Sequence, residues 1–358
     1  MYCFYNTLRH ARRKGLFGVA GSCHAHPMIG LMLLLQAATP SSATAPKAPS
    51  EIVAAAPAAD WVDIAPNDLL VMQLAPDRDG AGRKVVIQLM PPPFSQPWIA
   101  NIRTLAKAHW WDGTAVTRVQ DNYVAQWGDP TEKKPLPAAM MKTTESGYSV
   151  DGIAVQLAKF GAERTPEAEA STAEALDAAA PRKTRPSGQK DWHERDPYAS
   201  FVEIYQGWPV ASEGHRSTAR YWPVHCYGMV GVGRNLSPDA GTGAELYTVI
   251  GHAPRHLDRN IALVGRVVDG IENLSSLPRG TGPLGVYEKA EQRVPIVSIR
   301  LASELPEAER PHLQYLSTES ASFAAYANAR ANRKDAFFIV PAGGADICNI
   351  PVPIRRKP

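Results

Sequence analysis

The clustering of apolar and β-branched residues along the chain predicts a mainly β protein. Two such runs flank Asp77–Gly80, which is a turn by composition, and together they predict a β-hairpin. A glycine-punctuated stretch at 227–251 also has strand-like ends. The strands that we expect are 69–74, 85–89, 115–125, 261–268 and 296–301.

Helical spacing of apolar residues appears in two segments. Within Trp98–Ala106 the apolar side chains fall on one face, which predicts an amphipathic helix. Ser95 can cap this helix, with Pro97 in its first turn. A second helix is expected within 319–334, where aromatic residues recur at the same spacing.

Other parts of the chain are poor in strand-like runs. Residues 46–60 are rich in Ala and Pro, which is typical of a linker. Residues 165–180 are rich in Ala and Glu and fit a solvated helix, whereas 181–196 are polar and charged, as in an exposed loop. We expect 160–197 to be the most mobile part of the mature chain. Order should resume before residue 210.

The first 45 residues have the composition of an export signal. A basic cluster at 9–14 precedes the apolar run Met28–Ala38, which is within the roughly 7–15 residues of a signal-peptide core and too short to span a bilayer. An A-x-A pattern then predicts cleavage near Ala45 and a periplasmic or secreted protein. The long gap between the two features would be explained by a start codon assigned too far upstream. The alternatives to a cleaved signal peptide are a cytosolic tail or lipidation at Cys23.

Composition and charge narrow the class without naming an activity. Proline accounts for 31 of 358 residues, about 9% against a usual share of roughly 5%, which argues against long helices. The net charge of +3 gives no sign of nucleic-acid or membrane binding, and no later segment is long and apolar enough to span a bilayer. Signal cleavage would leave Cys226 and Cys348, which could pair in an oxidising compartment or stay as buried thiols.

Searches for common catalytic motifs find none. The sequence has no G-x-S-x-G elbow, P-loop, H-E-x-x-H or Cys-x-x-Cys. His252 and His256 are four apart, but Pro254 removes the helix that would place them on one face. Gly231 and Gly233 lack the third glycine and the setting of a dinucleotide site. We therefore expect no metal and no cofactor.

The most informative stretch is Asp112–Asp129, which reads DGTAVTRVQDNYVAQWGD. Arg118 and Gln126 are separated by an even number of residues, so on one regular strand they would share a face. Tyr123 is out of that phase, so a bend must intervene if all three converge. On these residues alone, a surface ion pair for Arg118 and a core position for Tyr123 are the simpler interpretation.

This stretch resembles the core motif of cyclophilin-type peptidyl-prolyl cis-trans isomerases, a Tyr/Trp-Asp-Gly turn followed by F-H-R-V-I, an aromatic residue and Q-G-G-D. The corresponding residues are W-D-G at 111–113, V-T-R-V-Q at 116–120, Tyr123 and Q-W-G-D at 126–129. Further matches in order are the proline-rich approach to the Asn101 helix, Met229, G-A-E-L-Y at 243–247, and H-L-D at 256–258 with V-G-R-V at 264–267. The resemblance covers about 69–130 and 224–301.

The resemblance implies a closed eight-stranded antiparallel barrel capped by two helices, whose activity is rotation about Xaa-Pro bonds. The clients would be proline-containing unfolded or exported polypeptides, and we expect a monomer. The insertion is either a simple surface element or a contact for clients. The implied parts are a leader at 1–45, a linker at 46–60, the cyclophilin-like domain at 61–301 with an insertion at about 131–220, and a C-terminal extension at 302–358 packed on the barrel.

The resemblance also implies roles for individual residues. Arg118 would be the catalytic donor, directed at the proline nitrogen or the preceding carbonyl, and Gln126 would orient it and bond the substrate backbone. Two pocket phenylalanines of the family are tyrosines here, whose hydroxyls need partners if buried. The residues that would wall the proline pocket are Tyr123, Val124, Tyr247 and Leu257.

Several positions in the substrate groove depart from the family pattern. The histidine before the arginine is Thr117, and the groove asparagine is Gly231, which loses side-chain bonds to substrate. The second glutamine is Glu245, whose carboxylate would either order Arg118 or neutralise part of its field. The tryptophan associated with cyclosporin contact is His256, so sensitivity to that drug is not expected.

These departures leave two functions open. Retention of Arg118 and Gln126 favours a working isomerase with an altered groove. Gly231 and Glu245 favour a proline-binding chaperone module that keeps the barrel but has little catalysis. A third interpretation, a chance match to an unrelated barrel, is discarded if Arg118, Gln126 and Leu257 lie around one cleft.

Overall fold

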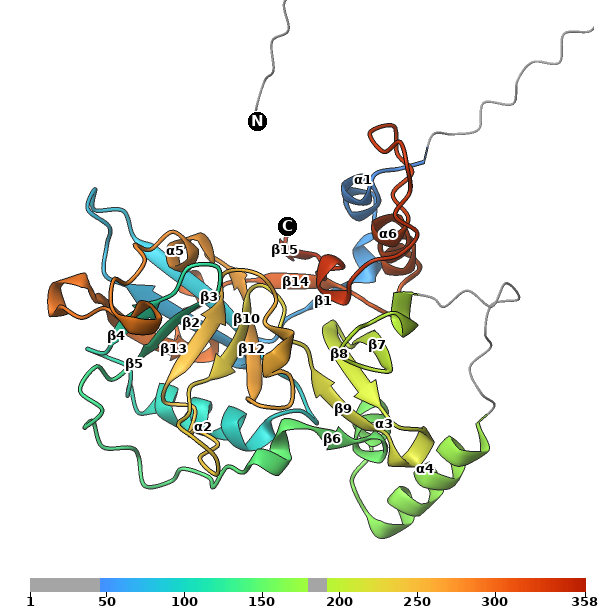
Figure 1. Ribbon diagram of the computed structural model, residues 1–358, viewed down its shortest axis with the longest axis horizontal. Coiled ribbons are helices and arrows are strands. Elements are labelled where there is room, and N and C mark those ends of the chain that lie inside the picture. The colour runs from blue at the N-terminus through green and yellow to red at the C-terminus, as the bar shows by residue number, and fades with distance from the viewer. Residues whose placement is uncertain (1–45, 180–191) are drawn as a thin grey trace, which may run out of the picture. The chain divides into compact units, whose positions relative to one another are not determined.

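A closed antiparallel barrel forms the centre of the fold (Figure 1). The computed structural model describes residues 46–179 and 192–358, so the expected leader and most of the loop predicted at 181–196 lie outside it. The strand order around the barrel is β10-β11-β5-β4-β13-β2-β3-β12, which confirms the predicted fold class. The strands are β2 Leu69–Leu74, β3 Arg83–Leu89, β4 Ala115–Val119, β5 Val124–Gly128, β10 Met229–Val232, β11 Leu246–Val249, β12 Leu263–Asp269 and β13 Val294–Leu301.

The predicted hairpin is present, but the strand expected at 115–125 is divided. Strands β2 and β3 pair antiparallel along their full length. Between β4 and β5 the chain turns at 120–123, where Asn122 has a φ of 49°. The strand-like run at 115–125 is therefore interrupted, and this turn is the bend that was required if Tyr123 is to lie near Arg118.

Helix α2, Gln96–Lys107, crosses one end of the barrel. It buries the predicted apolar face, including Trp98, Ile102 and Leu105. Ser95 is at the N-cap position and Pro97 is in the first turn, as predicted, but Ser95 has a φ of 55° and its side chain makes no capping bond. Its hydroxyl donates instead to the carbonyl of Leu263 in β12, at 2.7 Å. The second helix at the barrel, α5 Glu272–Ser275, is a single turn that contacts β3.

The insertion after β5 is built from a second sheet and two helices. Its sheet has the order β6-β9-β8-β7, and side chains such as Trp208 and Trp222 are buried in the same apolar core as the barrel. Helix α4 has no buried residue, as expected for a solvated helix. The elements are β6 Val150–Asp151, α3 Gly152–Lys159, α4 Pro166–Ala178, β7 Phe201–Tyr205, β8 Trp208–Glu213 and β9 Arg220–Pro223.

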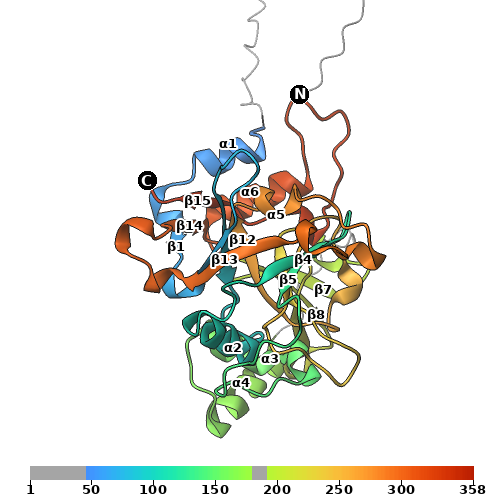
Figure 2. The same cartoon turned by 90° about the vertical axis from the view of Figure 1, so that its left-hand side faces the viewer.

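The segments before and after the barrel fold together. Strand β1 (Trp61–Asp63) pairs with β14 (Leu313–Leu316), which pairs in turn with β15 (Ile354–Arg356). Helix α1 (Pro49–Ala54) lies against α6 (Ala321–Ala331), so the linker expected at 46–60 is largely structured. Figure 2 shows these helices at the end of the barrel opposite α2.

The extension reaches the barrel through apolar side chains and a disulfide. Leu313 of β14 is buried against Leu69 and Val71 of β2. Cys348, in the turn Ile347–Asn349, is bonded to Cys226 just before β10, across 122 residues of sequence. The two cysteines are thus paired rather than free thiols. Among the described helices, none is long and apolar enough to cross a membrane.

Candidate active site

The hairpin of β4 and β5 places Arg118 beside Gln126. The two residues pair across the strands, after an irregularity between Val116 and Arg118 that shifts the register. The Nη1 group of Arg118 donates to Oε1 of Gln126 at 3.0 Å. The two residues expected to act together are therefore in direct contact.

A loop on the other side of β4 also holds the guanidinium. The Nε group of Arg118 donates to the carbonyl of Leu284 at 2.6 Å, and Nη2 donates to the side chain of Gln120. The loop is fixed to β4 by Tyr287, whose N–H donates to the Thr117 carbonyl at 2.9 Å. Sequence reasoning missed Leu284, because the contact is made by a backbone carbonyl in the turn Pro283–Gly285.

Gln126 connects Glu245 to Arg118 by hydrogen bonds. The Nε2 group of Gln126 donates to Oε1 of Glu245 at 2.6 Å, while its Oε1 accepts from Arg118. Burial lowers the pKa of Arg118, and the charges of Tyr123 and Glu245 oppose this effect. Glu245 thus orders the amide that orients the arginine, and it also adds a negative charge near it.

The expected pocket residues form a small apolar cluster next to Arg118. Val124, Tyr247 and Val249 are buried together, with Tyr123, Leu257 and Ile261 packed against them. The Tyr123 ring centroid lies 5.6 Å from the guanidinium carbon of Arg118 and 6.3 Å from the ring centroid of the exposed His256. Val249 and Ile261 were not predicted, although Val249 is two residues from Tyr247 on the same face of β11.

Two departures from the family pattern, Gly231 and Tyr247, lie in direct contact and depend on each other. Gly231 pairs with Tyr247 across β10 and β11. A Cβ atom at Gly231 would lie 2.3 Å from the Tyr247 hydroxyl oxygen, so no side chain fits there beside this tyrosine. The buried hydroxyl is bonded to Nε2 of His225 at 3.0 Å, and burial raises the pKa of Tyr247 well above its ordinary value.

No metal-binding arrangement accompanies these residues. Within 46–179 and 192–358, no three His, Cys, Asp or Glu side chains are grouped so as to hold a metal ion. What the site contains is a half-buried cation with oriented N–H groups beside an apolar surface. A cation held in this way can donate hydrogen bonds to an amide group and polarise it, which is the chemistry expected of proteins that act on peptide bonds without breaking them.

Comparison with known proteins identifies the family. Residues 86–301 match the family model described as cyclophilin type peptidyl-prolyl cis-trans isomerase/CLD. The chain therefore belongs to the cyclophilin-type peptidyl-prolyl cis-trans isomerases, and the resemblance seen in the sequence is confirmed. No curated protein matches the chain significantly.

Three solved structures are similar to the chain, and the first of them supports the fold. Cyclophilin AquaCyp293 from Hirschia baltica matches with a TM-score of 0.56 and 19% identity, over 82% of this chain and 92% of that one. A cyclophilin type peptidyl-prolyl cis-trans isomerase from Cryptosporidium parvum matches with a TM-score of 0.34 and 12% identity, over 65% and 96% of the two chains. The structure of that protein in the presence of the dipeptide Ala-Pro gives 0.33 and 12%, over 64% and 98%.

Proposed function

We propose that this isomerase accelerates rotation about Xaa-Pro bonds in exported protein clients, with Arg118 as the donor beside an apolar proline pocket. The observation that carries the proposal is the position of Arg118. Gln126 and Leu284 hold its guanidinium while Tyr123 links it to the cluster of Val124 and Tyr247. The residues expected to act on proline thus meet at one place.

The chemistry required is weakening of amide conjugation. Resonance gives the peptide bond a rotation barrier of about 18–20 kcal/mol. A donor directed at the proline nitrogen or the preceding carbonyl stabilises the twisted state, and about 1.4 kcal/mol of such stabilisation gives a tenfold rate. A guanidinium carries five N–H groups, and Arg118 uses one each on Nε, Nη1 and Nη2, so two remain without a partner among the described residues.

The apolar cluster offers a surface for the proline ring. Val124 and Tyr247 are buried at its centre, and the partly buried Leu257 packs against them. The half-buried Tyr123 and the exposed His256 stack beside this cluster, where they would contact the residues that flank proline. This arrangement favours proline-containing polypeptides as partners and needs no nucleophile.

Two observations support export of the protein. The sequence of the first 45 residues has the pattern of a signal peptide. The Cys226–Cys348 disulfide is of the kind that persists in oxidising compartments such as the periplasm. Both favour a periplasmic or secreted location and clients that fold there.

A proline-binding chaperone with little catalysis is the second candidate. One observation in its favour is the exposed carboxylate of Glu245, which is connected to Arg118 by two hydrogen bonds through Gln126. The other is Gly231, which has no side chain to bond the substrate backbone. In this case the pocket would bind proline segments while Arg118 contributes little to rotation.

Arg118→Ala separates the two candidates. We expect the variant to lose about tenfold to a hundredfold in kcat/KM on an Ala-Pro peptide and in proline-limited refolding. Arg78→Ala, in the exposed turn between β2 and β3, is the matched control and should keep full activity. Equal rates for wild type and Arg118→Ala would refute the catalytic role, and undiminished binding of unfolded clients by that variant would favour the chaperone.

A further inference from the structure

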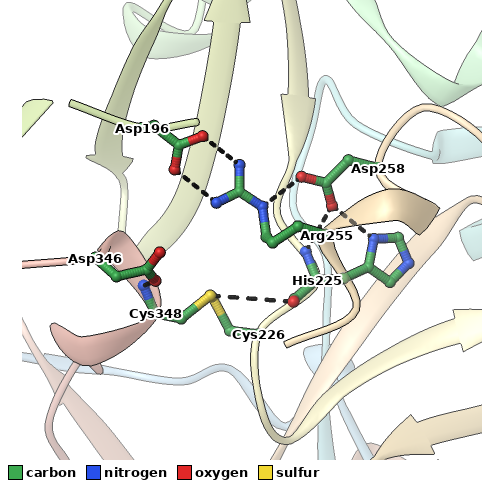
Figure 3. Close-up of a disulfide and its surroundings, with 7 residues drawn as sticks. All are labelled: Asp196, His225, Cys226, Arg255, Asp258, Asp346 and Cys348. Atoms are coloured by element: carbon green, nitrogen blue, oxygen red, sulfur yellow. Dashed lines mark hydrogen bonds and ion pairs between the residues drawn. A yellow bond between two sulfur atoms is a disulfide. The ribbon is translucent and has the colours of Figure 1, made fainter. Parts of the chain in front are cut away.

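A chain of buried polar groups starts at the proline pocket and ends in the insertion. The Tyr247 hydroxyl is bonded to Nε2 of His225 at 3.0 Å, and Nδ1 of His225 is bonded to Asp258 at 2.9 Å. The other carboxylate oxygen of Asp258 accepts from Nε of Arg255 at 2.6 Å. The two Nη groups of Arg255 donate to both oxygens of Asp196, at 2.6 and 3.0 Å (Figure 3).

Every side chain of this network is removed from solvent. The exposed fractions are 1% for His225, 4% for Asp258, 2% for Arg255 and 1% for Asp196. Burial alone would lower the pKa of Arg255, but the bonds to Asp196 and Asp258 outweigh it and raise the pKa. Asp258 accepts from Nε of Arg255 and Asp196 accepts from both Nη groups, so loss of either carboxylate would leave a buried donor of the cation without its partner.

The network holds two walls of the pocket. Through His225 it fixes the hydroxyl of Tyr247, whose ring is part of the pocket cluster. Arg255 and Asp258 also enclose His256 and Leu257 in the turn Arg255–Leu257, so their bonds fix the position of Leu257.

The network begins at Tyr247 of the barrel strand β11, but two segments outside the barrel contact it. Asp196 comes from the insertion, just after the turn Trp192–Glu194. His225 directly precedes Cys226, and Cys348 Sγ of the C-terminal extension lies 4.0 Å from the His225 carbonyl oxygen (Figure 3). The added segments therefore contact the groups that set the shape of the pocket.

We propose that Asp196 and Arg255 are positioning residues for the proline pocket, through which the insertion determines how closely the pocket fits the substrate ring. This inference rests on the proposed proline site. It assigns the insertion a role in specificity, in contrast to a surface element that merely stabilises the fold.

The test measures how strongly the pocket discriminates between substrate rings of different size. Matched peptides carry proline or pipecolate, whose ring has one more methylene, and both kcat/KM and Kd are measured for wild type and Asp196→Asn. A pocket discriminates one methylene by about 10–200-fold, and we expect Asp196→Asn to reduce this ratio by about threefold to tenfold. Glu213→Gln is the matched control, because it removes an exposed ion pair between the insertion and Arg259. This control should leave the ratio unchanged.

A second variant, Tyr247→Phe, tests whether the effect of Asp196 reaches the pocket through His225. In Tyr247→Phe the bond to His225 is absent, so Asp196→Asn should change the ratio less than it does in the wild type. Full additivity of the two substitutions would overturn the route through His225. An unchanged ratio between the proline and pipecolate peptides, together with a lowered melting temperature, would overturn the proposal. That result is expected if the network only stabilises the fold. If Asp196→Asn does not fold, Arg255→Lys, which keeps the cation, is measured in the same way.

The Kd values separate this proposal from the function on which it rests. If wild type catalyses rotation no faster than Arg118→Ala, the catalytic proposal fails. The ratio of the two Kd values still reports the fit of the pocket and decides the role of Asp196.

Discussion

Gly231→Ala should damage the pocket and the stability of the fold together. The added Cβ would lie 2.3 Å from the Tyr247 hydroxyl oxygen and 2.4 Å from Cζ, far inside van der Waals contact. The tyrosine ring must therefore move away from β10, and its bond to His225 must lengthen or break. Overpacking of a buried site costs about 1–3 kcal/mol, and loss of a buried hydrogen bond adds about 1–3 kcal/mol.

The assay combines equilibrium urea unfolding with kcat/KM on an Ala-Pro peptide. We expect the free energy of unfolding to fall by about 2–5 kcal/mol, the range left after allowing for partial relaxation. Gly82→Ala is the control, since its Cβ would meet only Gln73 Nε2 at 4.0 Å.

A double variant tests the cause. In Gly231→Ala with Tyr247→Leu, the hydroxyl and Cζ atoms that the new methyl would meet are gone. The combined loss of stability should then be smaller than the sum of the two single losses. Wild-type stability and activity in Gly231→Ala, or strict additivity in the double variant, would show that Gly231 and Tyr247 do not share one space.

Further predictions concern an acid, a disulfide and a loop. Burial would raise the pKa of Asp129, but hydrogen bonds from the Lys134 and Lys133 N–H groups and from Thr131 lower it to about 2. The stability from this group is present above the ordinary value near 3.8 and is lost as pH falls toward 2. Asp129→Asn should therefore cost about 1 kcal/mol at neutral pH, given solvent screening, and this difference should shrink below pH 4 in urea unfolding; parallel pH curves would contradict it. Cys348→Ser opens a loop of 122 residues and should lower the free energy of unfolding by about 2–5 kcal/mol, whereas an unchanged melting temperature would contradict this. Gly285→Val adds a Cβ 2.7 Å from the Val119 carbonyl oxygen at a φ of 79°, so it should displace Leu284 and lower kcat/KM about tenfold; full activity would show that the Leu284 carbonyl is not needed.

Local patterns in the sequence predicted the barrel better than its surroundings. The strands and α2 follow from apolar runs and spacing, because the same side chains that pack the barrel also set the local period. The Ala- and Pro-rich segment before the barrel was interpreted as a linker. Yet Pro49 stands in the first turn of α1, where proline is tolerated, and Ala is the best helix former.

The site was predicted where side chains carry a motif and missed where backbone or distant residues act. The spacing of the family motif identified Arg118, Gln126 and the pocket residues. The Leu284 carbonyl has no residue-type signature at all. Asp196 was placed in an exposed loop because its neighbours are charged, but its partner Arg255 is 59 residues away and buries it.

The sheet formed by β1, β14 and β15 also bears on the order in which the chain is made. Strand β1 pairs with residues 314–316, and Cys226 is bonded to residue 348. A ribosome produces these partners later, so β1 waits through the synthesis of the barrel and the insertion, and Cys226 waits through that of strands β10 to β13 and most of the extension. During that interval Cys226 is a thiol without its native partner. The C-terminal extension therefore acts as a closing step, whose arrival joins the first strand, the barrel and the neighbour of His225 at the same time.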